Sequence, residues 1–107
     1  MLPKKNRVDK KNIDLLFEKG TFIASPLFTF KYLIQKSPQV RISFIAPKKI
    51  AKLAVKRNFL RRKGYLILKK YIEQFPLGTL GVFIFKKPEE DILKIENEIK
   101  KILSKIN

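Results

Sequence analysis

The densest group of residues that could do chemistry is a run of cations in the middle of the chain. Residues 48–63 hold eight Lys or Arg residues and no acidic residue. On a helix, Arg57 and Arg61 share a face because they lie four positions apart. Like charges at this spacing repel one another, and a bound polyanion converts that repulsion into attraction. The run therefore predicts a surface that binds phosphate groups.

The residue types in this run suit nucleic acid. Arg presents a planar fork to phosphate, Lys presents a point charge, and Asn58 can pair with a base edge or a sugar hydroxyl. A single lysine of such a run is usually only solvated, whereas the whole group predicts a binding surface. The predicted RNA-binding residues are Lys48, Lys49, Lys52, Lys56, Arg57, Asn58, Arg61, Arg62 and Lys63.

The charge of the whole chain is distributed unevenly. The formal net charge is +16, and no acidic residue occurs between Glu18 and Glu73. Residues 73–107, in contrast, hold six basic and six acidic residues. A surface that is charged only for solubility usually mixes both signs. We therefore expect a polyanionic partner, with nucleic acid favoured over an anionic membrane surface.

Residues that could catalyse a reaction are scarce. The chain has no Cys and no His, which excludes disulfides, thiol nucleophiles, zinc sites and histidine bases. A metal-dependent nuclease needs converging carboxylates, but Glu89, Glu90 and Asp91 are explained as the start of a helix. We predict no catalytic residue and no metal ligand in this polypeptide. With no signal-peptide pattern and no apolar stretch of roughly 20 residues, a cytoplasmic protein is expected.

The elements that must position these residues follow from the apolar pattern. We predict one RNA-binding domain over residues 1–107, with a basic arm at 1–7 and an α+β fold in the order αβββαβα. A short helix is capped by Asp9 and ends at Gly20. Strands are predicted at Thr21–Ala24, Leu27–Ile34 and Arg41–Ala46, the last two as a hairpin, and at Leu80–Phe85.

Two longer helices complete the prediction. One occupies the second half of residues 48–75, where Gly64 lowers helix propensity and predicts a kink. The other begins at Pro88 and buries an isoleucine stripe that includes Ile92, Ile95 and Ile99.

The aromatic residues of the second strand have two interpretations. Phe28, Phe30 and Tyr32 alternate as a base-stacking platform would, but this pattern is more typical of a core face. The opposite face, with Thr29 and Lys31, is the better candidate for contact with nucleic acid. Phe17 lies at the edge of the first helix, next to where Lys31 would emerge.

The chain resembles the protein component of bacterial ribonuclease P along essentially its whole length. The residues that carry the resemblance are Leu2–Arg7, Phe17–Gly20, Arg41–Phe44, Ala46–Ile50 and Ala54–Arg62. The resemblance implies a small mixed four-stranded sheet packed with helices and a left-handed βαβ crossover. It also implies a subunit that binds a catalytic RNA and promotes endonucleolytic removal of the 5′ leader from precursor tRNA. In that family the RNA, with bound Mg²⁺, performs the hydrolysis.

The resemblance also assigns roles to residues. Arg57, Asn58, Arg61 and Arg62, joined by Lys48 and Lys49, would contact the catalytic RNA. Phe17 and Lys31 would bind the leader in a cleft between the first helix and the sheet.

Three positions depart from the family's pattern. Ile13 and Lys31 stand where aromatic residues are common, and Phe59 replaces a basic residue. Leader binding would therefore depend less on stacking and more on charge. The alternatives are a structural RNA-binding protein, such as a ribosomal protein, and a stand-alone nuclease.

Overall fold

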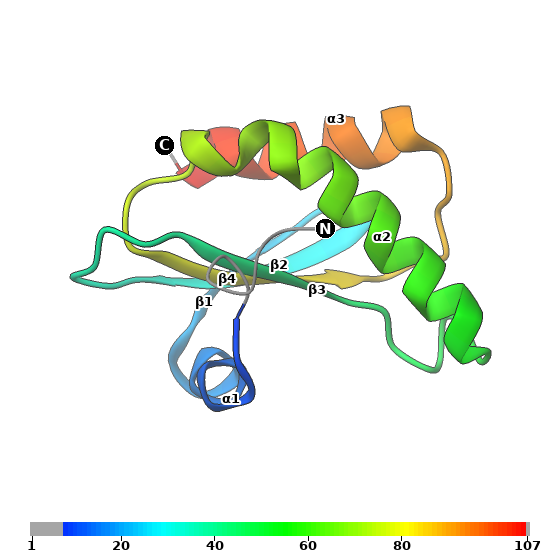
Figure 1. The fold of residues 1–107 in the computed structure, drawn as a ribbon, viewed down its shortest axis with the longest axis horizontal. Coiled ribbons are helices and arrows are strands. Elements are labelled where there is room, and N and C mark those ends of the chain that lie inside the picture. Colours follow the sequence, from blue (N-terminus) through cyan, green and yellow to red (C-terminus); the bar gives the residue numbers. More distant parts are fainter. Residues whose placement is uncertain (1–7, 107) are drawn as a thin grey trace.

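The computed structural model describes residues 8–106, so the predicted basic arm at 1–7 lies outside the described residues. Its elements, in chain order, are α1 (Lys10–Lys19), β1 (Thr21–Ala24), β2 (Phe28–Ile34), β3 (Arg41–Ile45), α2 (Ala54–Tyr71), a 3₁₀ turn (Ile72–Gln74), β4 (Thr79–Phe85) and α3 (Ile92–Ile106). This is the predicted αβββαβα order. Figure 1 shows α2 and α3 on one face of the sheet and α1 on the other.

The four strands form one mixed sheet in the order β1-β2-β4-β3. Strand β4 pairs antiparallel with β2 and parallel with β3, so it separates the two strands that were expected to form a hairpin. That prediction is wrong because alternation identifies a strand without identifying its partner. The near-continuous apolar run of β4 now has an explanation, since this central strand is buried on both faces.

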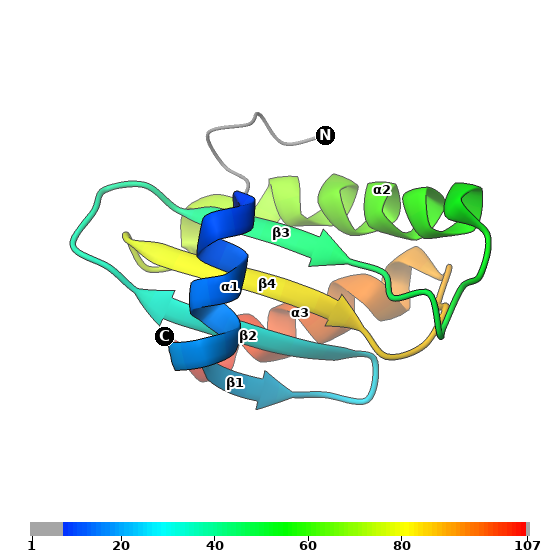
Figure 2. The ribbon, with the colours of Figure 1, turned by 90° about the horizontal axis from the view of Figure 1, so that it is seen from below.

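The connection from β3 through α2 to β4 is a left-handed crossover. In Figure 2, β3 and β4 both point to the right, β4 lies below β3, and α2 runs behind the sheet. Parallel strands are almost always joined with the opposite hand. The left hand that the family resemblance implied is therefore confirmed, and it places α2 beside the exposed edge of β3.

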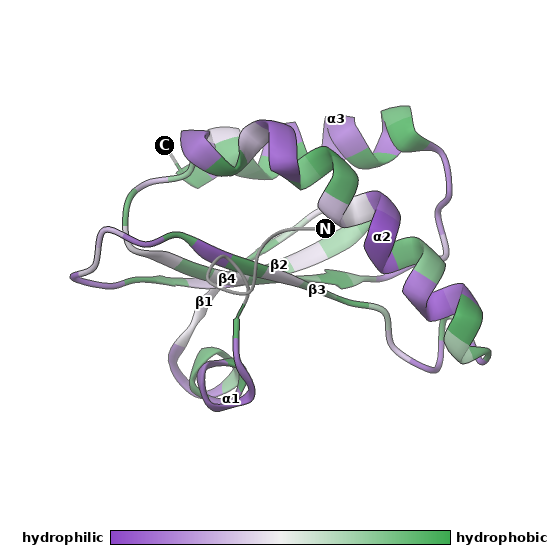
Figure 3. Ribbon diagram, viewed as in Figure 1, coloured by the Kyte–Doolittle hydropathy of each residue, from purple (hydrophilic) through white to green (hydrophobic). Residues whose placement is uncertain are grey.

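Two hydrophobic layers hold the fold together. Between the sheet and helices α2 and α3 lies an aromatic core, in which the Phe28, Phe44 and Phe83 rings contact one another. The core prediction for Phe28 and Phe30 is confirmed, since both are fully buried. A smaller layer, with Leu16, Leu80 and Val82, joins α1 to the opposite face. The hydropathy colouring in Figure 3 shows apolar and polar residues alternating along α2, as in a helix with one buried face.

Helix α1 begins where its capping residue predicts. The Asp9 carboxylate accepts a hydrogen bond from the Asn12 backbone N–H at 3.0 Å. Val8, just before the cap, is buried, and its backbone N–H donates to the Ser43 hydroxyl of β3 at 2.7 Å. These contacts fix the start of α1 against the edge strand β3.

Gly64 does not break α2, which is one continuous helix over Ala54–Tyr71. A Cβ atom at this position would lie only 2.7 Å from two ring carbons of Phe44. The predicted kink is therefore wrong, because this glycine lets the helix approach the sheet closely. The neighbouring Tyr65 hydroxyl accepts a hydrogen bond from the Phe44 backbone N–H at 3.1 Å, which fixes the same approach.

Helix α3 begins later than predicted. Its first residue is Ile92, and the Asp91 carboxylate accepts a hydrogen bond from the Leu93 backbone N–H at 2.9 Å. The residues from Pro88 to Asp91 therefore precede the helix, and Ile92 is exposed rather than part of the buried stripe. Ile95 and Ile99 are fully buried, as predicted.

Candidate nucleic-acid interface

A cleft of about 610 Å³ lies between the start of α1, strand β3 and one side of α2. Asp9, which caps α1, and Ile13 of α1 form one wall, and Ser43 and Ile45 of β3 also line the cleft. From α2 it receives Asn58, Arg61, Arg62 and Tyr65. Three of the nine predicted RNA-binding residues thus converge on one concavity, and we call Asn58, Arg61 and Arg62 the cleft flank of α2.

The cleft flank is exposed and partly organised. Asn58, Arg61 and Arg62 are all exposed. The Arg61 guanidinium donates a hydrogen bond from Nη2 to the Asn58 Oδ1 at 2.8 Å. A guanidinium has five N–H donors, so Arg61 keeps several for a phosphate while Asn58 holds its orientation. No acidic side chain neutralises Arg61 or Arg62 within residues 8–106.

Arg57 has a different role from its neighbours. Its Nη1 donates to the backbone oxygens of Ala51, at 3.1 Å, and Lys52, at 2.7 Å. Arg57 therefore ties the loop that precedes α2 to the first turn of the helix. This loop carries Lys48, Lys49 and Lys52, all exposed, so Arg57 holds three predicted RNA-binding lysines beside the helix.

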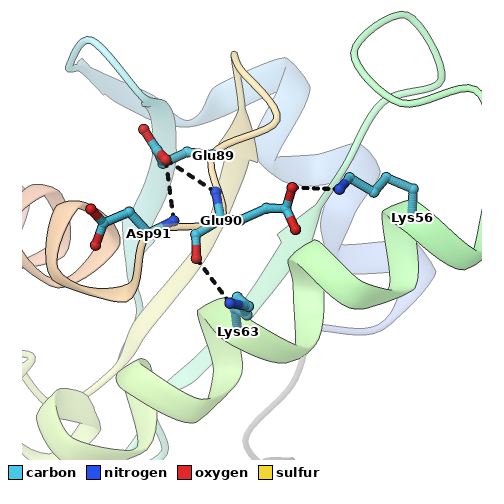
Figure 4. A network of polar contacts seen from close by, with 5 residues as sticks. All are labelled: Lys56, Lys63, Glu89, Glu90 and Asp91. Carbon is cyan, nitrogen blue, oxygen red and sulfur yellow. Dashed lines mark hydrogen bonds and ion pairs between the residues drawn. The ribbon is translucent and has the colours of Figure 1, made fainter.

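The remaining two predicted RNA-binding lysines lie on the opposite side of α2. The Lys56 ammonium pairs with the Glu90 carboxylate at 2.5 Å, and the Lys63 ammonium donates to the Glu90 backbone oxygen at 2.9 Å (Figure 4). The hydrogen bond from Lys56, reinforced by the charges of Lys56 and Lys63, holds the pKa of Glu90 below its usual value. The sequence prediction treated all these lysines as one surface, whereas the structure brings these two to an acidic loop.

Phe59 lies between these two lysines. The Lys63 and Lys56 ammonium groups lie 4.8 and 5.6 Å from the centre of its ring, within the range of cation–π attraction. The side chain is 41% exposed, so it is not part of the core. We call Lys56, Phe59 and Lys63 the outer flank of α2.

The two residues predicted to bind the leader contact each other. The Lys31 ammonium of β2 lies 4.7 Å from the centre of the Phe17 ring of α1. Neither lines the 610 Å³ cleft. Ile13 does line it, however, and Phe17 lies one turn further along the same face of α1. The Phe17–Lys31 pair thus continues the cleft wall towards β2.

Several lining residues of the cleft were not predicted. Asp9, Ser43 and Ile45 gave no signal of a site, because capping and strand propensity explain each of them. Tyr65 was hidden within a helix whose apolar spacing was assigned to the core. Only the packing of α1 and α2 against β3 brings these four residues together.

The described residues show neither a cluster of metal-binding side chains nor a membrane-spanning helix. Within residues 8–106, no three acidic side chains gather closely enough to hold a metal ion. No helix in this same range is long and apolar enough to cross a membrane.

The fold is that of known RNase P proteins. The Staphylococcus aureus RNase P protein aligns with a TM-score of 0.83 and 21% identity over 97% of this chain and 100% of its own. The Thermotoga maritima RNase P protein aligns with a TM-score of 0.83 and 19% identity over 94% of this chain and 97% of its own. No curated protein sequence matches the chain.

Likeness at these identities shows the fold alone, and the family follows from a separate comparison. The model of the Ribonuclease P family matches residues 2–107. The chain therefore belongs to the ribonuclease P protein family, as the sequence resemblance implied.

Proposed function

We propose that this chain is the protein subunit of a ribonuclease P ribonucleoprotein that removes the 5′ leader from precursor tRNA. The observation that carries the proposal is the cleft flank of α2, where Arg61 and Arg62 are exposed beside a cleft and have no acidic partner among residues 8–106. Family membership supports the same function. In this proposal the protein binds and positions RNA, and the catalytic RNA breaks the phosphodiester bond.

The cleft flank and the loop before α2 would bind the catalytic RNA. Arg61 and Arg62 offer forked donors to phosphates, and Asn58 offers an amide to a base edge or a ribose hydroxyl. Lys48, Lys49 and Lys52 extend the cationic surface because Arg57 ties their loop to the helix. Each phosphate contact releases counterions, so binding should weaken steeply as salt rises.

The Phe17–Lys31 pair would bind the single-stranded leader. Phe17 is 46% exposed and offers part of a ring to a base, and Lys31 offers a charge to the adjoining phosphate. With Ile13 in place of an aromatic residue, this surface depends more on charge than on stacking. Mg²⁺ would belong to the holoenzyme and be bound mainly by the RNA.

Reconstitution tests this function directly. The purified chain, added to a bacterial ribonuclease P RNA, should lower the Mg²⁺ concentration needed to process precursor tRNA. It should also raise affinity for precursor tRNA over mature tRNA. The matched control is a variant with Arg61→Ala and Arg62→Ala, which should lose most of the effect. If the wild-type chain changes neither cleavage nor substrate affinity, the proposal is wrong.

A structural RNA-binding protein, such as a ribosomal protein, explains the charge equally well. Purification from cells separates the two functions. A ribonuclease P subunit should carry one stable RNA with it, whereas a ribosomal protein should sediment with ribosomal subunits. The stand-alone nuclease predicts cleavage by protein without any RNA subunit.

A further inference from the structure

Phe22 is an exposed aromatic residue on the edge strand β1, and the proposed function assigns it no role. Phe22 of β1 is 64% exposed, which is more than the other two exposed phenylalanines, Phe17 and Phe59. Leaving a phenylalanine ring in water forgoes about 2–3 kcal/mol of burial. Because β1 is an edge strand, the ring has no neighbour on its outer side within the sheet. Such a side chain is a candidate for contact with a partner.

The strand register places Phe22 next to Lys31. The two residues are directly opposite each other in the antiparallel β1–β2 pair. Side chains in such a pair point to the same face of the sheet, with Cβ atoms about 4.5–5.5 Å apart. Lys31 contacts Phe17 of α1, so the shared face is the one that α1 covers. Lys31 therefore has one exposed aromatic ring on α1 and a second on β1.

The residue pair next to Phe22 and Lys31 carries small side chains. Ala24 and Thr29 are the next residue pair on this face, and both side chains are small. The sequence from Thr21 to Ile34 contains no acidic residue, so neither strand repels an anion. Two rings beside one cation, next to two strands without acids, match the alternation of bases and phosphates in a single strand.

We propose that Phe22 is a base-stacking residue that, with Lys31 and Phe17, forms a subsite for an unpaired nucleotide of the leader. This inference rests on the proposed function and adds a residue to it. In it, Phe22 supplies a second exposed aromatic ring, from β1, in addition to that of Phe17 from α1. Lys31 would contact the phosphate between the bases that stack on Phe22 and Phe17.

The test compares Phe22→Leu with Phe22→Tyr in the complete holoenzyme. The leucine variant keeps an apolar side chain and removes the ring, whereas the tyrosine variant keeps the ring. We expect Phe22→Leu to reduce the preference for precursor over mature tRNA about fivefold or more, the lower end of what one stacked base contributes. Phe22→Tyr should retain the preference. Leu77→Ala, which changes a similarly exposed apolar residue in the turn before β4, is the matched control and should leave the preference unchanged.

A leader without bases makes the test specific to stacking. With abasic leader nucleotides, wild-type and Phe22→Leu holoenzymes should bind equally, because no base remains to stack. If Phe22→Leu retains the wild-type preference on an ordinary leader, the inference is wrong while the proposed function stands. A loss that persists on the abasic leader, or a change in oligomeric state by light scattering, would also overturn it. If the wild-type holoenzyme shows no preference for precursor tRNA, this inference is wrong, and the proposed function is wrong as well if the chain also leaves cleavage unchanged.

Discussion

The two flanks of α2 carry similar numbers of cations, yet they differ in what those cations contact. On the cleft flank, Arg61 donates a hydrogen bond to Asn58, and Arg61 and Arg62 are exposed beside a cleft. On the outer flank, Lys56 and Lys63 both contact Glu90 (Figure 4). The difference shows that charge density along a helix overstates the surface available to a polyanion, because the fold supplies an anion to one side.

The identity of the cations agrees with this division. Both residues bound to Glu90 are lysines, and both unneutralised residues that line the cleft are arginines. Arg holds a phosphate with paired donors in a fixed plane, whereas Lys acts as a flexible point charge. We infer that the cleft flank carries the directional contacts with RNA and that the outer flank contributes little to them.

Removing the cleft flank should have the largest effect. The double variant Arg61→Ala, Arg62→Ala should weaken RNA binding roughly tenfold or more and lower the salt slope by about 0.7–0.9 for each lost phosphate contact. The measurement is the affinity for ribonuclease P RNA over a range of salt concentrations. Because both side chains are exposed, thermal stability should stay unchanged. An unaltered salt slope would show that this flank does not face the RNA.

A substitution that pushes α2 away from the sheet should have the next largest effect, in this case on stability. In Gly64→Ala, the new Cβ meets the Phe44 ring, which is buried among other rings and cannot move away. Overpacking costs about 1–3 kcal/mol, and better helix propensity returns about 1 kcal/mol. We expect the free energy of unfolding in denaturant to fall by about 1 kcal/mol. Phe44→Leu in the same chain should recover part of the loss, whereas a more stable single variant would contradict the close approach.

Removing the outer flank should have a smaller effect on RNA binding. In Lys56→Ala, Lys63→Ala, both lost charges were already engaged by Glu90, so affinity should change by less than about threefold. The salt slope should fall by less than in the arginine double variant. Equal losses of RNA affinity in the two double variants, measured side by side, would contradict the inferred difference between the flanks.

The smallest effect is expected at Glu90 and depends on pH. Its pKa in the folded chain is below the ordinary value of 4.5, so its ion pair stabilises the fold above that pH. The contribution is lost as pH falls through the lower folded pKa. Glu90→Gln should therefore lower the melting temperature slightly at neutral pH and have no effect in strong acid. Glu73→Gln, which removes the same charge from the 3₁₀ turn, is the control; a loss independent of pH would exclude the ion pair as its cause.

The sequence predicted the local features of this fold well. Asp9 caps α1, the apolar run at residues 80–85 is a fully covered strand, and the element order is correct. Each of these depends on neighbours in the chain, so spacing and residue type are sufficient. The start of α3 was misplaced because Pro88 and three acids fit a first turn, whereas Asp91 caps the helix instead.

What the sequence could not predict depends on distant partners. Strand β4 separates β2 from β3, and no pattern within those two strands specifies that insertion. Glu90 reaches Lys56 across 34 residues, and Phe22 meets Lys31 only through the strand register. The RNA-binding run therefore stays a prediction, and its division into two flanks could be seen only in the fold.

The central position of β4 also has a consequence for how the chain folds. Of the four strands within residues 8–106, β4 is synthesised last, yet both β2 and β3 pair with it. Until residues 79–85 emerge, β2 and β3 have no shared partner, and the part already made carries nearly all of the net positive charge. The four-stranded sheet therefore cannot form until distant segments meet. This requirement slows folding and leaves strand edges exposed in the meantime. A polyanion that bound the unfinished chain would relieve its self-repulsion. We therefore expect an RNA partner to assist the folding of the chain as well as to bind the folded protein.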